Sequence, residues 1–304
     1  MRHFHNKGQV RESRPVPKIL RVQNLNHAYS VGTPFEQKAL QGVDFCVEQG
    51  EILGIIGHTG SGKSTLLQHL NGTLTPSAGK VFFDGIDIYE SKAKTRAVRF
   101  QVGLVFQYPE HQLFEETIYQ DIAFGPKNMG LDEAAINVRV REAAELVGLT
   151  EKQLEASPFT LSGGQKRRAA IAGVMAMRPQ VLILDEPTAG LDPAGRDKIM
   201  ESVRKFQKET GAAVILVTHS MEEIARTVNR VLVMNGGKIT MSGTCSEVFA
   251  QKEALCAIGL AVPEVTEVIS QLRAMGLPLS SDIFTVEQAV QAILTQKGGG
   301  VDVG

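Results

Sequence analysis

Short apolar runs separated by turn residues fill residues 19–89, which is the pattern of a sheet made of short strands. A strand is predicted at each of four such runs, at residues 19–25, 43–47, 52–56 and 80–83. Asp84 and Gly85 form a turn signal directly after the last run. Residues 64–70 follow the third run after a glycine-rich loop and have helical periodicity. This region therefore contains a predicted strand–loop–helix unit.

The pattern becomes helical over residues 108–177, where apolar positions recur at intervals of three and four. The clearest helix spans residues 131–147, and Gly148 supplies its stop signal. Strand signals return at residues 181–184 and 214–217. Alternating strands and helices of this kind predict a mainly parallel sheet that is covered by helices on both faces.

The helices that flank the last of these strands have recognisable starts. Asp192 has the side chain of an N-cap, and Pro193 suits the first helical turn. Ser220 and Glu223 have the spacing of a capping box, which predicts a second helix after residue 220.

Two further amphipathic helices are predicted in the tail of the chain. Pro263 opens the first, and Thr285 with Gln288 caps the second. Their apolar stripes pack either within a small core or against a partner copy, and the sequence leaves both alternatives open.

These patterns divide the chain into four parts. Residues 1–18 lack apolar periodicity and are predicted to be a flexible N-terminal extension. Residues 19–250 form the main domain, with a helical subdomain at about residues 108–178. Residues 251–297 form a C-terminal helical extension, and residues 298–304 a flexible tail.

Composition limits the classes of partner. The chain has 304 residues, 43% of them hydrophobic and 21% charged, which is ordinary for a globular protein. Its net charge of −1 creates no overall attraction to nucleic acid or anionic lipid, so no nucleic-acid partner is expected. The basic run at residues 166–168 is typical of a solvated helix face, with a contact point as the alternative. Three cysteines without metal-ligand spacing indicate free thiols in a reducing compartment.

A phosphate-binding motif follows the strand at residues 52–56. It fits the pattern G-x-x-x-x-G-K-[ST], in which backbone N–H groups and a lysine surround a phosphate chain. Its residues are Gly57, His58, Thr59, Gly60, Ser61, Gly62, Lys63 and Ser64. Lys63 is expected to neutralise phosphate oxygens, Ser64 to ligate Mg²⁺, and Thr65 to donate to the α-phosphate. A plain glycine-rich turn is the alternative, and the motifs that follow in order argue against it.

Two carboxylates follow the buried strand at residues 181–184. Asp185 lies at the carboxyl edge of the predicted sheet, where it can ligate Mg²⁺. Glu186 comes next, on the side of an attacking water, and is the candidate general base. Two solvated loop charges are the alternative, but the preceding strand and Pro187 disfavour it.

Three more residues complete the candidate site. His219 follows a predicted strand and suits a hydrogen bond to the γ-phosphate, and Gln107 follows the apolar run 102–106 and suits Mg²⁺. Tyr29 is placed to stack on adenine. Each residue alone is more often structural, and the order of the motifs is what favours function.

A second motif resembles the signature of ABC-type ATPases, which contacts the nucleotide held by another ATPase domain. Its residues are Leu161, Ser162, Gly163, Gly164 and Gln165. With Gln107, the Asp185-Glu186 pair, residues 189–192 and His219, it resembles the ordered motifs of ABC transporter ATPases over residues 19–243. This resemblance implies an α/β fold with a mainly parallel core sheet, an N-terminal antiparallel β subdomain and a helical subdomain.

Residues 106–114 and 123–126 resemble more specifically the energy-coupling factor transporters. Residues 33–35, 57–60 and 69–72, together with the C-terminal helices, are similar to the second of the two ATPase subunits of that family. The resemblance implies that the extension at residues 251–297 serves dimerisation with another ATPase subunit.

The resemblance implies a dimer in which Lys63 and Ser64 of one subunit face Ser162 and Gly164 of the other across ATP. Asp192 belongs to a loop at the dimer contact. The implied partners are a paralogous ATPase, with an identical chain as the alternative, a transmembrane scaffold subunit and a membrane subunit that captures the substrate. ATP hydrolysis at the cytoplasmic face of the membrane then drives uptake of a vitamin or a transition-metal ion.

Two competing functions are less well supported. A soluble ABC protein that acts outside transport would carry long coiled-coil inserts or a second cassette, and this chain has neither. A degenerate subunit would bind ATP without hydrolysing it, but Glu186 and His219 are both present. The cargo cannot be read from this chain because another polypeptide selects it.

Overall fold

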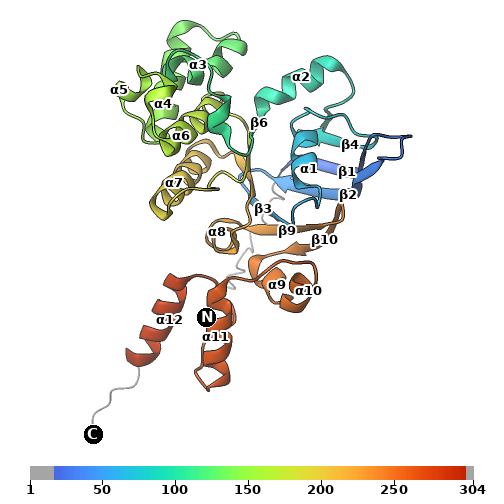
Figure 1. Cartoon of the computed structure of the whole chain (residues 1–304), viewed down its shortest axis with the longest axis vertical. Coiled ribbons are helices and arrows are strands. Elements are labelled where there is room, and N and C mark those ends of the chain that lie inside the picture. Colours follow the sequence, from blue (N-terminus) through green and yellow to red (C-terminus); the bar gives the residue numbers. More distant parts are fainter. Residues whose placement is uncertain (1–16, 299–304) are drawn as a thin grey trace, which may run out of the picture.

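The computed structural model describes residues 17–298. An antiparallel sheet occupies the N-terminal part of the fold, with strand order β2-β1-β4-β5 (Figure 1). Its strands are β1 (Lys18–Tyr29), β2 (Gln37–Glu48), β4 (Ala78–Phe83) and β5 (Ile86–Asp87). Both long strands extend beyond the predicted apolar runs, because hydrogen bonding between β1 and β2 continues to the pair Tyr29 and Gln37.

A six-stranded sheet forms the centre of the molecule, in the order β10-β9-β3-β8-β7-β6. Its strands are β3 (Ile52–Ile56), β6 (Val102–Val105), β7 (Val181–Asp185), β8 (Ala213–Val217), β9 (Arg230–Asn235) and β10 (Lys238–Gly243). The pairs from β9 to β6 are parallel, and only β10 pairs antiparallel. Every residue of β3, β6, β7 and β8 is buried, as expected for parallel strands covered on both faces.

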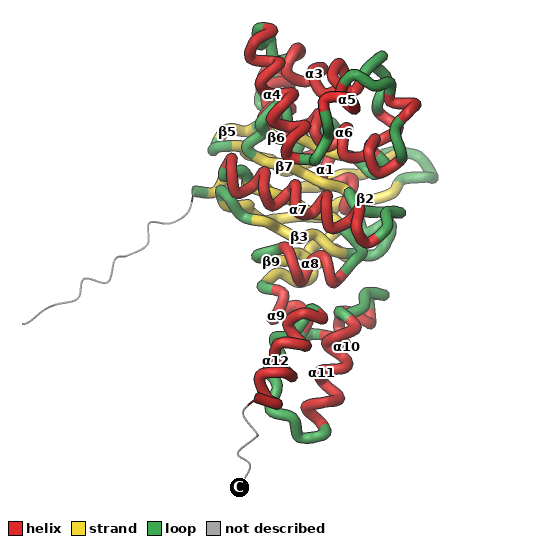
Figure 2. Tube along the Cα trace, turned by 90° about the vertical axis from the view of Figure 1, so that its left-hand side faces the viewer, coloured by secondary structure: helices red, strands yellow, loops and turns green. Residues whose placement is uncertain are grey.

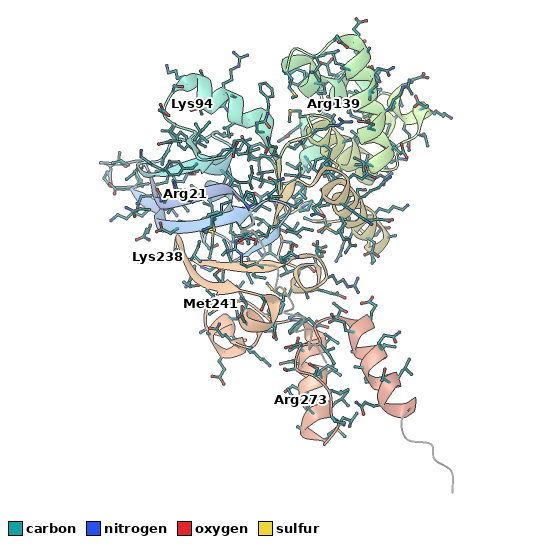
Figure 3. The ribbon with its side chains drawn as sticks, turned by 180° about the vertical axis from the view of Figure 1, so that it is seen from behind. Arg21, Lys94, Arg139, Lys238, Met241 and Arg273 are labelled. Atoms are coloured by element: carbon teal, nitrogen blue, oxygen red, sulfur yellow. The ribbon has the colours of Figure 1, made fainter. Side chains whose placement is uncertain are left out.

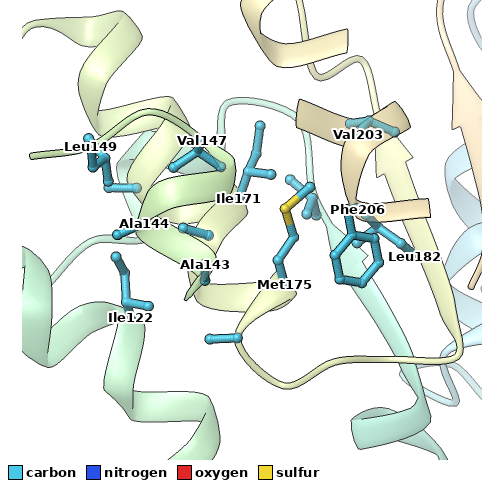
Figure 4. Close-up of a cluster of buried hydrophobic side chains, with 14 of the residues drawn as sticks. Ile122, Ala143, Ala144, Val147, Leu149, Ile171, Met175, Leu182, Val203 and Phe206 are labelled. Carbon is cyan, nitrogen blue, oxygen red and sulfur yellow. The ribbon is translucent and has the colours of Figure 1, made fainter. Parts of the chain in front are cut away.

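Alternate residues of the central strands enter two different cores. Val181 and Ile183 of β7 face the core shared with the antiparallel sheet and with α1 (Lys63–Leu70). Leu182 and Leu184 face the opposite core, which α7 (Pro193–Thr210) covers (Figures 2 and 4). The sheet is therefore the middle layer of the domain. Short helices α2 (Lys92–Gln101) and α8 (Met221–Thr227) complete the main domain.

A helical lobe lies between β6 and β7 in sequence and projects from the sheet (Figure 1). It contains η1 (Pro109–Gln112), α3 (Ile118–Asn128), α4 (Glu133–Leu146), α5 (Glu151–Leu154), η2 (Pro158–Thr160) and α6 (Gly163–Met175). Arg139 on α4, labelled in Figure 3, donates to the carbonyl of Met177 at 3.1 Å and so ties α4 to the end of α6.

The last two helices, α11 (Glu264–Ala274) and α12 (Val286–Gly298), form an extension (Figure 2). The two helices before them, α9 (Cys245–Phe249) and α10 (Lys252–Ala257), pack instead with α8 and β9 of the main domain. Ile269, Leu279, Ile283 and Ala289 are buried between α11 and α12. Other apolar positions of the two helices stay exposed: Val268, Met275, Val286, Val290 and Leu294. Internal packing therefore uses only part of the apolar stripes.

Two expectations need correction. The Ser220 hydroxyl accepts the N–H of Glu223 at 3.2 Å, but the Glu223 carboxylate does not complete the capping box. It accepts the hydroxyls of Thr188 and Thr218 instead, both at 2.9 Å, because these loops converge beside it. The basic run 166–168 is not a fully solvated face either, since Arg167 is only 2% exposed.

Parts of the expected termini, residues 1–16 and 299–304, lie outside the described residues. Within residues 17–298, no helix has the length and apolar character needed to span a membrane.

Burial in the core predicts that two Phe→Ala substitutions differ in their effect on the stability of the protein. Phe206 on α7 is 1% exposed, whereas Phe159 is 89% exposed. We expect Phe206→Ala to lower the free energy of unfolding by about 3–5 kcal/mol, because it removes buried surface and leaves a cavity. Phe159→Ala should change it by less than about 0.5 kcal/mol. Chemical denaturation of both variants without nucleotide measures the difference, and equal losses would contradict this account of the core.

Candidate functional site

The glycine-rich loop between β3 and α1 packs against β2 and against the turn between β9 and β10. Gly62 has a φ of +101°, and a Cβ there would lie 2.5 Å from the carbonyl oxygen of Ala39 on β2. The N–H of Gly237, in the β9–β10 turn, donates to the Ser61 carbonyl at 3.0 Å. Only glycine fits position 62, so the loop shape depends on residues distant in sequence.

Lys63 and the start of α1 create a positively polarised cradle. The Lys63 ammonium donates to the carbonyls of Gly57 at 2.6 Å and His58 at 3.0 Å, so its side chain folds back over the loop. Burial lowers the pKa of Lys63, while Glu186 and Asp185 oppose that shift. Among the described residues, no side chain caps the start of α1. Its first N–H groups are therefore free to bind an anion.

Asp185 ends strand β7 beside the first turn of α1. Its Oδ2 accepts the Ser64 hydroxyl at 2.9 Å. Burial raises the pKa of Asp185, and the Ser64 hydrogen bond and Lys63 work against this shift. Hydroxyl and carboxylate oxygens are hard ligands of the kind that Mg²⁺ accepts, and here one of each lies in the same place.

Glu186 sits in a strained backbone conformation, with φ of 52°. Burial raises the pKa of Glu186 to about 7. A hydrogen bond from the backbone N–H of His219 opposes this shift, with 3.4 Å between the nitrogen and Oε2. The ring Nε2 of His219 lies 3.1 Å from Oε1 but is not directed for a hydrogen bond. Among the described residues, buried Oε1 therefore has no donor, which suits an oxygen that holds a water.

Tyr29 lies at the rim of the site and is 39% exposed. Its hydroxyl is 3.1 Å from the Thr65 hydroxyl, and its ring contacts the edge of His27 at 4.6 Å between centroids. His27 in turn is hydrogen-bonded to buried His69, with 3.2 Å between Nδ1 and Nε2. The aromatic side chain is thus held beside the phosphate loop by its own neighbours.

A pocket of about 300 Å³ gathers most of the candidate residues. It is lined by Tyr29, Gln37, Ala39, Thr59, Gly60, Gly62, Lys63, Ser64, Thr65, Gln107, Asp185, Glu186 and His219. Gln37 and Ala39 were not predicted, because only the pairing of β2 with β1 brings them to the site. Tyr29 ends β1, Asp185 ends β7, and segments that follow β3, β6, β7 and β8 supply the remaining groups, as expected at the carboxyl edge of a parallel sheet.

Several candidate residues lie outside this pocket. Gly57 packs against Met234, Ser61 is buried, and the His58 ring Nε2 lies 2.9 Å from Asn235 Oδ1. Asp192 caps α7, accepting the N–H of Gly195 at 2.8 Å.

The signature motif is also outside the pocket, at the start of α6 in the helical lobe (Figure 1). Ser162 and Gln165 form a capping box there, with the Ser162 N–H 2.8 Å from Gln165 Oε1. Leu161 is buried, whereas Ser162 and Gly163 are exposed and Gly164 is partly exposed. The motif therefore presents a helix N-terminus to the outside of this chain.

Sequence reasoning missed one buried ion pair near the site. Arg167 on α6 donates to Glu110 of η1, with Nε 2.8 Å from Oε2 and Nη2 2.5 Å from Oε1. Burial alone would raise the pKa of Glu110, but the Arg167 hydrogen bonds hold it below its usual value. No local pattern distinguishes this arginine from its neighbours in the basic run.

Comparison with known proteins identifies the family. The ABC transporter family model matches residues 40–189. The chain is 54% identical to the energy-coupling factor transporter ATP-binding protein EcfA2 of Clostridium perfringens, over 90% of this chain and 97% of that protein. It is 51% identical to the EcfA2 protein of Caldanaerobacter subterraneus subsp. tengcongensis, over 93% and 99%. The chain belongs to the family of energy-coupling factor transporter ATP-binding proteins. It is thus an ATP-binding subunit of an energy-coupling factor transporter and an ATPase.

A solved structure supports the same assignment. The cbiO1 protein of Clostridium perfringens, described as part of the ABC transporter complex cbiONQ, has a TM-score of 0.71 and 42% identity and covers 83% of this chain and 99% of its own. The expected fold is confirmed, with its parallel core sheet, antiparallel β subdomain and helical subdomain. The expected resemblance to the second ATPase subunit of the family is confirmed as well.

The packing of the loop predicts different effects at two glycines with positive φ. A Cβ at Gly60 meets nothing within 4 Å, whereas one at Gly62 meets Ala39. We expect Gly60→Ala to lower the free energy of unfolding by about 1–2 kcal/mol through backbone strain alone. Gly62→Ala should cost clearly more because the clash adds to that strain. Denaturation without nucleotide compares the two, and a smaller loss for Gly62→Ala would refute the close approach to β2.

Proposed function

We propose that this subunit supplies one half of each of two composite ATP sites in a transporter that imports a vitamin or a transition-metal ion. The observation that carries the proposal is the separation of two nucleotide-binding elements. One pocket holds Lys63, Asp185, Glu186 and His219, while Ser162 starts a helix in a different lobe. A second ATPase subunit must then complete the pocket with its own signature motif.

A related dimer supports this arrangement. The ATP-binding cassette MJ0796 was solved as a dimer bound to ADP and Pi in a post-hydrolysis state. It has a TM-score of 0.68 and 28% identity to this chain and covers 74% of it and 98% of its own length. In the proposed dimer, Lys63 and Ser64 bind the phosphates from one side. The partner's equivalents of Ser162 and Gly164 approach from the other side, and Asp192 lies at the contact.

The donor set fits Mg²⁺. The Ser64 hydroxyl and the Asp185 carboxylate are already 2.9 Å apart, and Gln107 lines the same pocket. Within residues 17–298 no three His, Cys, Asp or Glu side chains form a metal cluster, so phosphate oxygens and water would complete the coordination. When bound, Mg²⁺ supplies neutralisation of the phosphate charge.

Glu186 is the proposed general base for hydrolysis. Its free Oε1 accepts a proton from the attacking water, and the strained turn holds this oxygen in place. Lys63 neutralises the charge on the phosphates, and His219 hydrogen-bonds the γ-phosphate. Tyr29 stacks on adenine beside Thr65. Loss of the γ-phosphate removes a contact shared by both subunits, so the dimer opens.

A variant of the base separates binding from turnover. We expect Glu186→Gln to bind ATP normally, to accumulate a closed dimer and to lose about 10²–10⁴-fold in turnover, because an amide cannot accept the proton. Glu222→Gln is the matched control, since Glu222 is an exposed carboxylate on α8 that pairs with Arg226 of the same helix. ATP binding, phosphate release and dimer size are measured for both. Turnover by Glu186→Gln within threefold of the unaltered protein would refute the assignment.

The C-terminal extension is the proposed second contact between ATPase subunits. Its exposed apolar positions on α11 and α12, such as Val268 and Val290, would be covered by the equivalent helices of the partner. The partner is proposed to be a paralogous ATPase, with an identical chain as the alternative. A transmembrane scaffold and a substrate-capture membrane subunit complete the transporter at the cytoplasmic face of the membrane.

The helical lobe is the proposed docking surface for the scaffold. Phe114 is 65% exposed and Phe124 45% exposed, and their rings meet edge to face at 5.0 Å between centroids. Phe114 follows η1, which starts two residues after Gln107, so nucleotide state can reach this patch over a short path. Glu110, which lies in the same segment, points inward to Arg167 and is not part of this patch.

An assay of ATP-driven uptake tests the proposed docking surface. We expect Phe114→Ser combined with Phe124→Ser to lower ATP-driven uptake about tenfold or more in vesicles containing the whole complex, because aromatic anchors dominate interface energies. ATP binding by the isolated subunit should not change. Val138→Ser on α4, 53% exposed in the same lobe, is the control and should leave uptake intact. Normal uptake by the double variant would exclude this patch as the docking surface.

A further inference from the structure

Arg167 is the most deeply buried charged side chain of the signature helix, with 3% of its side chain exposed. It lies two residues after Gln165, the last residue of the signature motif. Its two hydrogen bonds to Glu110 form a fork of the kind that only a guanidinium provides. This fork joins α6 to η1, directly after the segment that carries Gln107.

The third contact of the guanidinium reaches the catalytic turn. Nη1 of Arg167 donates to the carbonyl of Ala189, and the N–H of Ala189 donates to the carbonyl of Glu186 at 3.2 Å. The guanidinium carbon also lies 5.6 Å from the centre of the Tyr108 ring, next to Gln107. One side chain of the signature helix therefore contacts both the segment after Gln107 and the turn that holds the proposed base.

We propose that Arg167 is a positioning residue that fixes the Glu186–Ala189 turn to the signature helix, and so couples the two composite ATP sites. This inference rests on the proposed role of Glu186. Within one chain, the signature helix serves the nucleotide of the partner, whereas Glu186 serves the chain's own nucleotide. A shift of the helix upon binding the partner's nucleotide moves the carbonyl of Ala189, and with it the strained turn of Glu186.

The chemistry of the contact separates this role from plain structural support. The Glu110 carboxylate takes up Nε and Nη2 of Arg167, so the carbonyl of Ala189 requires a further donor, which Nη1 provides. Arginine has five donors in a fixed fork, whereas lysine is a compact point charge that cannot reproduce this arrangement. If the ion pair alone matters, weakening it at Glu110 should be as harmful as removing the arginine. If the contact with Ala189 matters, changes at Arg167 should be worse.

The test uses the full-length subunit in its purified transporter complex, with kcat and KM for ATP measured per active nucleotide site. We expect Arg167→Met to lower kcat about 10–100-fold with KM within about threefold, since a misplacement of 1 Å can cost about 10²-fold. Arg167→Lys should lose less. Glu110→Gln should stay closest to the unaltered protein, because the amide oxygen still accepts from Arg167 and the contact with Ala189 remains.

Two further measurements distinguish positioning from folding. In a Glu186→Gln background, Arg167→Met should cause no additional loss of single-turnover rate, because both changes act through the same group. Arg141→Met is the matched control, since Arg141 forms an exposed ion pair with Glu151 in the same lobe, and its kcat should not change.

Three outcomes would overturn the proposal: a kcat for Arg167→Met within twofold of the unaltered protein, an equal loss in Glu110→Gln, or a further loss in the Glu186→Gln background. If Arg167→Met does not fold, the order of Arg167→Lys and Glu110→Gln decides. Turnover that survives Glu186→Gln would instead refute the proposed base.

Discussion

The structure depends on one electrostatic requirement, which is a concave set of backbone N–H groups that can surround a polyphosphate. The uncapped start of α1 and the loop before it meet this requirement, and Gly62 lets the loop lie against β2. The parallel sheet then directs the remaining groups to the same place. Because β6, β7 and β8 end at one edge, Gln107, Asp185 and His219 converge although they are far apart in sequence.

Convergence of charged groups in a partly buried pocket changes their chemistry. Burial raises the pKa of Glu186 to about 7 and lowers the pKa of Lys63, because a partly buried environment disfavours the charged form of each group. Lys63 interacts electrostatically with Glu186 and Asp185, and Oε1 of Glu186 accepts no hydrogen bond from the residues that the structure describes. This free oxygen and the strained backbone beneath it are features that a purely structural turn would not need.

The same chain places its signature motif away from its own pocket, on a lobe that packs against the sheet through a separate set of contacts. Under the proposed function, a site divided in this way works only in an assembly. Arg167 connects the signature helix to the turn that follows Glu186, because its guanidinium contacts both Glu110 of η1 and the carbonyl of Ala189. In our proposal, mechanical coupling and catalysis meet at this buried charge, because electrostatic contacts are stronger in the low dielectric of a protein interior.

The sequence by itself determined the strand–loop–helix around Lys63, the carboxylates at the end of β7 and the caps at Asp192 and Thr285, because local periodicity and side-chain chemistry encode such features. It also placed the motifs in the order that identifies an ABC ATPase. Only the tertiary structure decided that Gln37 lines the pocket, that Glu223 bonds two threonines, and that Arg167 is buried. Those outcomes depend on which distant segments pack together, and a charged residue carries no local mark of the partner that will bury it.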